Sequence, residues 1–396
     1  MQLEQLKARA AARVDERASL LDDLALRIHA RPELAFEEVF ACSVLCDALA
    51  AEGVSVERGL PGLETAFRAD AGADTGTGSG ATVAILAEYD ALPGVGHACG
   101  HNLIGAGALG AFLAVRDVMP TARLRGSVRI LGCPAEELGN GKVALIRAGA
   151  FRDVDAALMY HPGDRDEIDP LMLAMVNLDV SFAGKAAHAA AEPQAGINAL
   201  DGLVLGWNAI AALRQVVRSD SRLHGIITDG GSAANIIPER AAARLMVRSP
   251  DNAYLRELQA RVLACFEGSA KATGCSLQYR WSETCELVNS SRPLAESFRA
   301  NAAALGRELR PRGPGQTHGS TDMGNVTTLV PGIHPFIRIT DRTVPGHSHE
   351  FAQAARTEFA LESMHLAAKA LAMTALDVLC QPALRRGVKE AFDARK

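Results

Sequence analysis

The stretch TVAILAEYDALPGVGHACGHN, residues 82–102, decides the fold of this chain. Its first six residues are an apolar run that predicts a buried strand, and the Pro/Gly segment that follows predicts a loop at the carboxyl end of that strand. The loop gathers Asp90, His97, Cys99 and His101 within a dozen residues. Carboxylate, thiol and imidazole groups are donors that divalent metals take in proteins, so this loop is a candidate metal site.

Two further apolar runs end in the same kinds of side chain. Residues 128–133 lead to the adjacent pair Glu136 and Glu137, and residues 156–160 lead to His161. In open α/β sheets, sites form at the carboxyl ends of the strands. Three successive strands that end in metal-type ligands therefore indicate one shared site.

Length and composition set the class of protein. The chain has 396 residues, which is more than one ordinary core holds, so we expect two domains. A hydrophobic content of 48% and a charged content of 22% are typical of a well-packed globular protein. The net charge is −5 and there is no lysine-rich run, which argues against a nucleic-acid-binding surface.

The N-terminus and the cysteines indicate where the protein resides. Residues 2–27 mix spaced apolar residues with many charges, which predicts an amphipathic helix and not a signal peptide. We find no run of about 18 apolar residues and expect no membrane span. The eight cysteines form no paired framework, so we expect a cytoplasmic, reducing location.

Helix and strand patterns alternate over residues 1–172, which predicts the first part of an α/β domain with a mixed sheet and helices on both faces. The segment from Asp70 to Gly80 is rich in Gly, Thr, Asp and Ser and is predicted to be a flexible turn. The predicted helices cover residues 3–30, 36–52, 103–116 and 142–150, and the predicted strands cover residues 64–69, 82–88, 126–133 and 156–161.

A different pattern fills residues 173–288. Its order is strand–helix–strand–strand–helix–strand, the split βαβ order of a small ferredoxin-like α+β domain. The six predicted elements cover residues 173–182, 196–217, 223–229, 239–248, 253–273 and 275–282.

Residues 289–396 return to the first pattern. We expect a helix at 293–305, a Gly/Thr loop at 313–325, a short strand at 334–339, a His-rich loop at 345–350 and a C-terminal pair of helices. The simplest architecture is one catalytic domain, made of 1–172 and 289–396, that is interrupted by an inserted domain.

An ordered set of motifs resembles a known family. The motifs are HARPELAFEE (29–38), DALP (90–93), HACGH (97–101), PAEE (134–137), YHPG (160–163), GKAAHA (184–189), NIIP (235–238) and GSTDMGN (319–325). Together they resemble the dinuclear-metal amidohydrolases of the aminoacylase and carboxypeptidase type, peptidase family M20. Within that family the sequence is most similar to the branch of hippurate, indole-acetyl-amino-acid and p-aminobenzoyl-glutamate hydrolases.

The resemblance implies a catalytic domain with two divalent metals and a smaller lid domain that also dimerises. It implies that Asp90 orients a ligand histidine and that Glu136 is the general acid/base. The metal would be zinc, or manganese or cobalt. The implied metal ligands are Cys99, His101, Glu137, His161 and His347.

The resemblance also gives roles to three residues of the inserted domain. His188 would stabilise the oxyanion of the tetrahedral intermediate, often from the partner subunit. Asn235 and Arg248 would bind the carboxylate of the substrate, for which the arginine fork is suited. A surface-loop histidine and a surface ion pair are the alternative interpretations of His188 and Arg248. A homodimer is implied by the resemblance alone, since the periodicity of residues 196–217 and 223–229 does not show one.

The sequence departs from the branch at two places. Asn102 replaces the usual Asp after the HACGH motif, and Glu88-Tyr89 replaces the usual residues before Asp90. We expect the second change to alter the choice of substrate and not the metals. The last ligand is ambiguous because His347 and His349 flank Ser348, and the spacing to Phe351 favours His347.

The residues themselves support this chemistry. Two adjacent glutamates on an extended segment point in opposite directions, so the loop after the strand must bend if both are to face one cavity. Water acidified between two metals would be the nucleophile, and Glu136 would take its proton and pass it to the leaving amine. The alternative for Cys99 is a small buried thiol or a nucleophile, whereas His97 and His29 are expected to be structural.

We therefore predict a hydrolase that cleaves the amide of an N-acyl or N-aroyl amino acid, or of a dipeptide. Three alternatives stay open. The first is a hydrolytic deaminase of the same fold that releases ammonia, the second is a Cys–His nucleophilic hydrolase, and the third is a binding module without activity.

Overall fold

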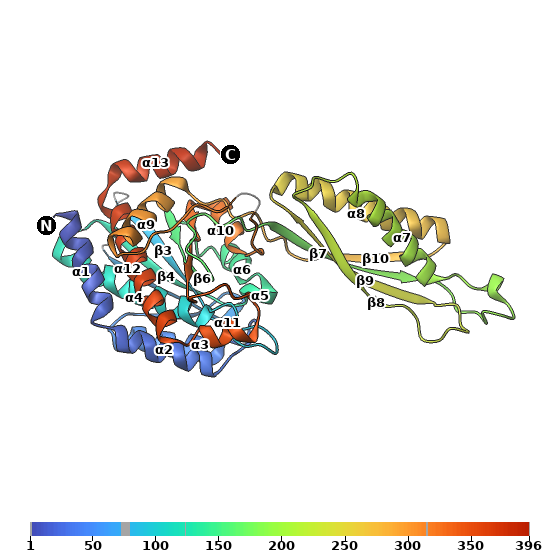
Figure 1. Ribbon diagram of the computed structural model, residues 1–396, viewed down its shortest axis with the longest axis horizontal. Helices are drawn as coiled ribbons and strands as arrows, with labels where there is room; N and C mark the ends of the chain where they lie inside the picture. Colours follow the sequence, from blue (N-terminus) through green and yellow to red (C-terminus); the bar gives the residue numbers. More distant parts are fainter. Residues whose placement is uncertain (1, 73–79, 123, 314–315, 396) are drawn as a thin grey trace. The chain divides into compact units, whose positions relative to one another are not determined.

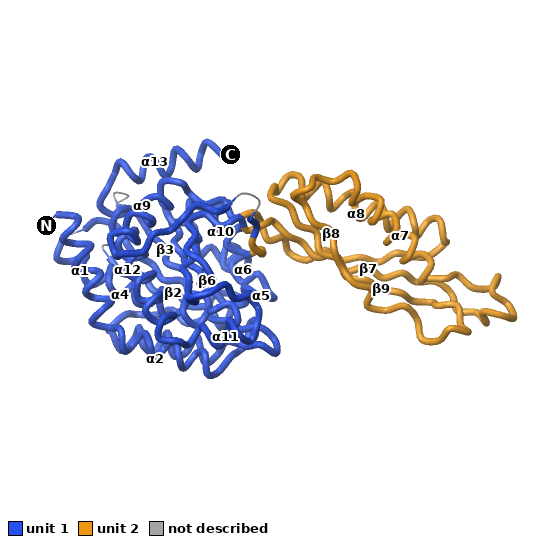
Figure 2. Tube along the Cα trace, viewed as in Figure 1, with its two compact units in different colours: residues 1–171, 288–317, 321–396 blue, residues 172–287, 318–320 orange. Residues whose placement is uncertain are grey.

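The computed structural model describes residues 2–72, 80–122, 124–313 and 316–395, so part of the predicted turn at 70–80 lies outside the described residues. The chain divides into two compact units (Figure 2). Unit 1 comprises residues 1–171, 288–317 and 321–396, and unit 2 comprises residues 172–287 and 318–320. The insertion was expected at 173–288, and the small segment 318–320 was not expected to belong with it.

Unit 1 is built on a mixed sheet. Within the described residues its strand order is β1-β2-β4-β3-β5-β11, with β3, β4, β5 and β11 parallel and the β1–β2 and β2–β4 pairs antiparallel. Strands β6 and β12 pair separately in parallel. The strands are β1 Glu57–Leu60, β2 Leu63–Gly72, β3 Ala81–Glu88, β4 Gly126–Cys133, β5 Ala156–Leu158, β6 His161–Gly163, β11 Gly332–Ile333 and β12 Phe336–Arg338.

The helices of unit 1 pack around this sheet (Figure 1). The single helix predicted at 3–30 is two helices, because the chain breaks between Asp15 and Ala18. The helices are α1 Leu3–Asp15, α2 Ala18–Ala30, α3 Val39–Ala51, α4 His101–Ala122, α5 Glu136–Gly139, α6 Gly141–Arg147, α9 Arg292–Ala304, α10 Met323–Leu329, α11 His349–Ala354, α12 Glu358–Cys380 and α13 Pro382–Asp393.

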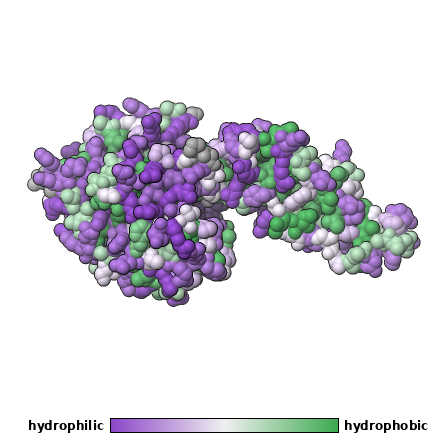
Figure 3. Space-filling view, in the orientation of Figure 1, coloured by the Kyte–Doolittle hydropathy of each residue, from purple (hydrophilic) through white to green (hydrophobic). Residues whose placement is uncertain are grey.

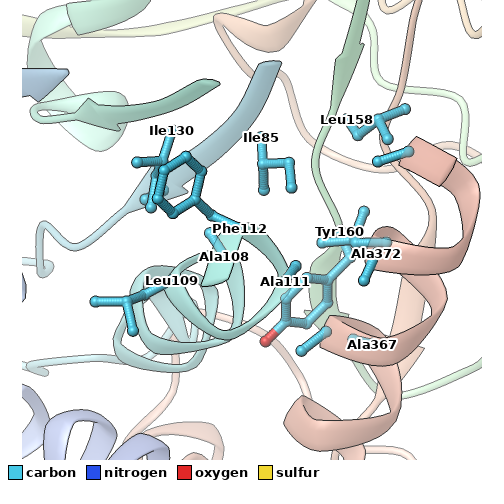
Figure 4. Packing of buried hydrophobic residues seen from close by; sticks show 14 of the residues in the cluster. Ile85, Ala108, Leu109, Ala111, Phe112, Ile130, Leu158, Tyr160, Ala367 and Ala372 are labelled. Carbon is cyan, nitrogen blue, oxygen red and sulfur yellow. The ribbon is translucent and has the colours of Figure 1, made fainter. Parts of the chain in front are cut away.

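The core of unit 1 lies between β3, β4 and the two long helices α4 and α12. Alternate strand residues such as Ile85 and Ile130 point toward α4, where Phe112 and small alanines meet them (Figure 4). Both strands are buried on both faces, as their apolar runs predicted. On the face opposite α4, the side chain of Arg129 is also enclosed and bonds to Ala150 O and Asp153. This packing fixes the position of the strand ends.

Helices α4 and α12 are long and apolar enough to cross a membrane, by length and composition alone. The most apolar stretch of α4 is 83% buried inside the protein, and that of α12 is 78% buried. Such burial is typical of core helices, and the predicted lack of a membrane span stays a prediction.

Unit 2 has the expected element order. Its four strands form an antiparallel sheet in the order β10-β7-β9-β8, and the apolar side chains of one face pack against both helices. This is the ferredoxin-like arrangement. The elements are β7 Ala174–Ala183, α7 Ala199–Arg214, β8 Arg222–Asp229, β9 Arg240–Ser249, α8 Asn252–Thr273 and β10 Ser276–Trp281.

Candidate metal centre

The candidate site lies where the central strands of unit 1 end. Strand β3 ends at Glu88, and the HACGH loop leads into α4, whose first residue is His101. Gly100 has φ +77° and no room for a side chain, since a Cβ there would lie 2.8 Å from Pro162. This close approach brings the rings of His101 and His161 to a centroid separation of 5.7 Å.

His101 is held by Asp90 in one orientation. Its Nδ1 lies 3.0 Å from Asp90 Oδ1 and 3.1 Å from the carbonyl oxygen of the same residue. Both partners are acceptors, so Nδ1 carries a proton, and in the neutral ring Nε2 has a free lone pair. Asp90 Oδ2 also accepts from the backbone N–H of Glu137 at 2.9 Å. One carboxylate therefore positions two of the predicted metal ligands.

Two donor clusters share Cys99. The first joins Cys99 to His101 and His161, the second joins it to Glu137 and His347, and within each cluster the donor atoms lie within 4.8 Å of one another. In the second cluster His347 Nε2 lies 3.4 Å from Cys99 Sγ and 3.8 Å from Glu137 Oε2. Thiolate, imidazole and carboxylate donors at such spacing can hold two divalent cations.

Unpartnered buried atoms fit the same conclusion. His101 Nε2 and Glu137 Oε1 are buried, lie 4.0 Å apart and have no hydrogen-bond partner in the part of the chain that the structure describes. Buried polar groups are nearly always paired, because leaving one unpaired costs about 1–3 kcal/mol. These atoms are free on the side where a cation would lie.

The structure separates the two candidates for the last ligand. His347 faces Cys99, whereas His349 is the first residue of α11. His347 has φ +59°, a left-handed backbone conformation that is uncommon outside glycine, and its N–H donates to Ala98 O at 3.1 Å. The geometry therefore favours His347.

The bend required after β4 is present at Ala135. Ala135 and Asn140 flank α5 with φ of +60° and +52°, so Glu136 and Glu137 lie in a single helical turn and not on an extended segment. The Ala135 N–H donates to Glu38 Oε1 at 2.8 Å, and Glu38 itself is fully buried. Glu136 can form a donor group with Glu137 and His101, so both glutamates reach the same site.

The electrostatics of the site follow from its burial. Desolvation, reinforced by the charge of Glu137, raises the pKa of Glu136 well above its usual value. Desolvation and Glu137 likewise raise the pKa of the Cys99 thiol. A divalent cation acts in the opposite direction on both groups, because it favours their ionised forms.

Lys142, Glu88 and Asp322 form a buried cluster that the sequence motifs did not assign to the site. All three are fully buried. Lys142 Nζ donates to Glu88 Oε1 and, at 2.6 Å, to Asp322 Oδ1, and its backbone N–H donates to Asp322 Oδ2. The two carboxylates raise the pKa of Lys142 well above its usual value despite desolvation. The available signal was a lysine five residues after a paired glutamate, which looks like an ordinary helix residue.

His334 was also missed. It is fully buried, and neither ring nitrogen has a hydrogen-bond partner within the described ranges. The centroid of its ring lies 5.3 Å from that of His161. The other nearby histidines have structural contacts, as expected. His97 Nε2 pairs with Ile28 O at 3.1 Å, and His29 Nε2 pairs with Ala352 O at 2.7 Å. Asn102 donates to the carbonyls of Ala25 within α2 and of Ala355 at the end of α11, so its contacts are structural.

Unit 2 contains the other three predicted residues, at two different places. His188 and Asn235 are both exposed and lie together, since His188 forms a bridge with Ile236 and Ala189 N–H donates to Asn235 O. Arg248 lies near the other end of β9, eight residues beyond Arg240, which is roughly 26 Å along the strand. The expectation that Asn235 and Arg248 of one chain bind the same carboxylate therefore does not fit the geometry of unit 2.

Arg248 is half-buried and has no acidic partner in the described part of the chain. Its guanidinium donates to Ser320 Oγ at 3.3 Å and to Met246 Sδ at 3.0 Å and 3.1 Å. Its predicted alternative, a surface ion pair, is absent from the described contacts. An arginine whose charge is unpaired in this way can receive a carboxylate.

Comparison with known proteins decides the family. The family model described as "Peptidase family M20/M25/M40" matches residues 84–377. The chain belongs to this family. It is a hydrolase that acts on amide bonds, and its donor clusters are those of a protein that binds divalent metal. The resemblance inferred from the motifs is thus confirmed.

Similar proteins cover the whole chain. The Xaa-Arg dipeptidase of Mus musculus is 40% identical over 411 residues, covering 100% of this chain and 94% of that protein. A p-aminobenzoyl-glutamate hydrolase polypeptide of Escherichia coli is 29% identical, covering 91% of this chain and 89% of that protein. Among solved structures, a dinuclear metal binding peptidase of Bacillus subtilis from the M20 family has a TM-score of 0.71 at 21% identity, covering 92% and 99%. That last likeness supports the fold.

Proposed function

We propose that this chain hydrolyses the amide bond of dipeptides or N-acyl amino acids with two bound divalent cations. The observation that supports this most is the pair of donor clusters that share Cys99, with Glu136 beside them. Five residues would hold the cations, and these are Cys99, His101, Glu137, His161 and His347.

The roles of the residues follow from their chemistry. When bound, the cations would polarise the scissile carbonyl and acidify a water. Glu136 accepts the proton of that water and delivers it to the nitrogen of the leaving amine, so that the C–N bond breaks without release of an amide anion. Asp90 keeps the Nε2 lone pair of His101 aimed at the site.

We propose zinc as the cation, with manganese and cobalt as alternatives. A shared thiolate and three imidazoles suit zinc, whereas the carboxylate of Glu137 suits all three metals. Elemental analysis of the purified protein, followed by reconstitution of the metal-free protein with each ion, identifies the metal.

The substrate class is tested with a panel. The likeness to an Xaa-Arg dipeptidase over the whole chain makes dipeptides with a C-terminal arginine the first candidates. N-acyl and N-aroyl amino acids complete the panel, with free amine and ammonia measured separately. We expect amino acid release that a chelator abolishes and that added metal restores. Release of ammonia, or full activity after chelation, would contradict the proposal.

One distance favours a second candidate function. Cys99 Sγ lies 3.4 Å from His347 Nε2, as a thiol nucleophile would lie from its base. However, desolvation and Glu137 raise the pKa of this thiol, whereas a nucleophilic cysteine needs a lowered pKa. Alkylation of Cys99 that substrate prevents, without any dependence on metal, would favour this candidate.

We propose a homodimer formed through unit 2. Strand β8 is at an edge of its sheet and exposes Ile226 and Ile227, and α7 exposes Val204 and Leu205. Figure 3 shows hydrophobic residues gathered on the surface of unit 2. Exposed apolar edge strands tend to pair with another chain. Two chains would also allow His188 and Asn235 of one copy to act with Arg248 of the other.

The oligomeric state tests this proposal. Light scattering on the wild-type chain should give twice the mass of the chain, and Ile226→Lys should give a monomer, since it places a charge on the proposed pairing edge. A substitution of exposed Leu329 in unit 1 to Lys is the matched control. A monomeric wild-type protein would exclude the dimer.

We also propose a cytoplasmic location, with no nucleic-acid or membrane partner. All eight cysteines are free, which suits a reducing compartment. The net charge of −5 supports the lack of a nucleic-acid partner. Cell fractionation with a membrane and a soluble marker tests the location.

A further inference from the structure

Two buried atoms face each other beside the metal donors without a hydrogen bond. Glu88 Oε2 and His101 Nε2 are 3.4 Å apart, and both side chains are 0% exposed. Neither atom has a hydrogen-bond partner among the described residues. Glu88 departs from the family pattern, and no role in the proposed function uses it.

In the neutral ring that a metal ligand must have, both atoms are acceptors. His101 donates its Nδ1 proton to Asp90, so its Nε2 presents a lone pair. The Glu88 carboxylate has only lone pairs to offer. Two acceptors that face each other in a dry interior are unfavourable unless a cation binds both.

The separation fits a shared cation. Zinc binds imidazole nitrogen at about 2.0–2.1 Å and carboxylate oxygen at about 2.0–2.2 Å, so donor atoms 3.4 Å apart subtend an angle of roughly 110° at the metal. That is the tetrahedral angle. By comparison, Glu137 Oε1 is 4.0 Å from the same nitrogen, which corresponds to a wider angle of roughly 145°.

The other oxygen of Glu88 is fixed from behind. Lys142 Nζ bonds to Glu88 Oε1, and Asp322 holds Lys142 through both its ammonium and its backbone N–H. Glu88 can therefore turn only Oε2 toward His101. Lys142 and Asp322 thus fix the orientation of Glu88, as Asp90 fixes the orientation of His101.

We propose that Glu88 is a further protein ligand of the cation held by His101, and that Lys142 is the residue that positions it. This inference rests on the metal-dependent function proposed above. It adds a sixth donor to the five that the family resemblance supplied, and it gives the departure at Glu88 a chemical meaning.

Metal binding to a Glu88→Gln variant tests the inference without any substrate. The metal-free wild-type and variant proteins are each titrated with Zn²⁺ in competition with a chromophoric chelator. We expect one of two sites to weaken by more than about 100-fold, beyond the roughly 10–100-fold typical of losing a partner behind a ligand. The visible spectrum of the Co²⁺-loaded variant should change as well, because it reports the coordination of the ion. Lys142→Met should give a smaller loss, within that 10–100-fold range.

Glu52→Gln is the matched control. Glu52 is an ion-paired glutamate of the same unit, bonded to Arg17 and Arg116, and it contacts none of the metal donors. This variant should retain both zinc affinities and the wild-type Co²⁺ spectrum.

The inference is overturned if Glu88→Gln keeps both zinc affinities and the wild-type Co²⁺ spectrum. In that case Glu88 would pair directly with a doubly protonated His101 ring and would not bind the cation. A wild-type chain that binds no zinc would overturn it as well.

If the variant does not fold, a crystal structure of the zinc-loaded wild-type protein decides. Glu88 Oε2 bound directly to zinc supports the inference, and any other position overturns it. Wild-type protein that binds zinc but cleaves no substrate would refute the proposed function and leave this titration decisive.

Discussion

The two units of this protein hold their functional side chains in opposite ways. In unit 1, Glu88, His101, Lys142 and Asp322 are fully buried; Lys142 pairs with Glu88 and Asp322, and His101 is held by Asp90. In unit 2, His188 is exposed, and only its backbone and the N–H groups of the next turn hold it. The first arrangement fits cations held in a fixed geometry, whereas the second leaves the His188 side chain exposed to solvent.

The largest expected effect is on the base in unit 1. Glu136→Gln keeps the shape of the side chain but removes its proton acceptor, so kcat should fall by about 10²–10⁴-fold. The metal content, measured by elemental analysis, should stay at the wild-type value, because the five proposed ligands are unchanged. Loss of metal in this variant would instead make Glu136 a ligand.

Chelation should lower the stability of unit 1 and leave the stability of unit 2 unchanged. Removing the cations leaves the carboxylates of Glu136 and Glu137 close together with no cation to offset their charge, so unit 1 should lose stability. At a free metal concentration of about 1,000 times Kd, the bound cations add about 4 kcal/mol to the free energy of unfolding. Hydrogen exchange should accelerate around β3 and α5 on chelation, and that of β7 and β9 should stay constant. Equal acceleration in both units would contradict this division.

His188→Ala removes a hydrogen-bond donor from the proposed oxyanion site. We expect kcat to fall by about 10²–10³-fold with little change in melting temperature, because the side chain is exposed. Mixing this variant with Glu136→Gln sharpens the test. If His188 acts on the partner subunit, the mixed dimer contains one complete site and activity returns, whereas mixing restores nothing if His188 acts within its own chain.

The smallest effect is expected at Arg248. Arg248→Ala should raise KM by about 10–100-fold, as expected for losing a hydrogen-bonded charged partner of a substrate carboxylate, and should leave kcat near its wild-type value. For the wild-type enzyme, amidation of the substrate's C-terminal carboxylate should raise KM by the same factor. An equal KM in the variant and the wild-type enzyme for the acid substrate would exclude this role.

Much of this fold could be predicted because strand periodicity and burial agree. The apolar runs at β3 and β4 lie within one or two residues of their predicted bounds, and the six elements of unit 2 occur in the predicted order. The break that divides residues 3–30 into α1 and α2 was not predicted, because its residues are ordinary helix formers and the break arises from packing. The short strand β6 was merged with β5 for a similar reason, since its partner β12 is far away in the sequence.

The site was predictable only where a strand end marked it. Cys99, His101, Glu137 and His161 follow apolar runs, and the structure brings them together. Lys142, Asp322 and His334 belong to the same buried region but follow no such run, and only tertiary packing shows that they meet. The separation of Asn235 from Arg248 was likewise hidden, because sequence spacing does not tell the two ends of β9 apart.

The left-handed turn at Ala135 has a consequence for how this enzyme could diversify. Its amide is held by Glu38, a residue at the start of α3 that is anchored by Thr65 and by the N–H of Phe36. The direction in which the two glutamates point is therefore governed by a side chain that never meets substrate. Inherited changes around that anchor could retune the reaction while every reacting group stays the same.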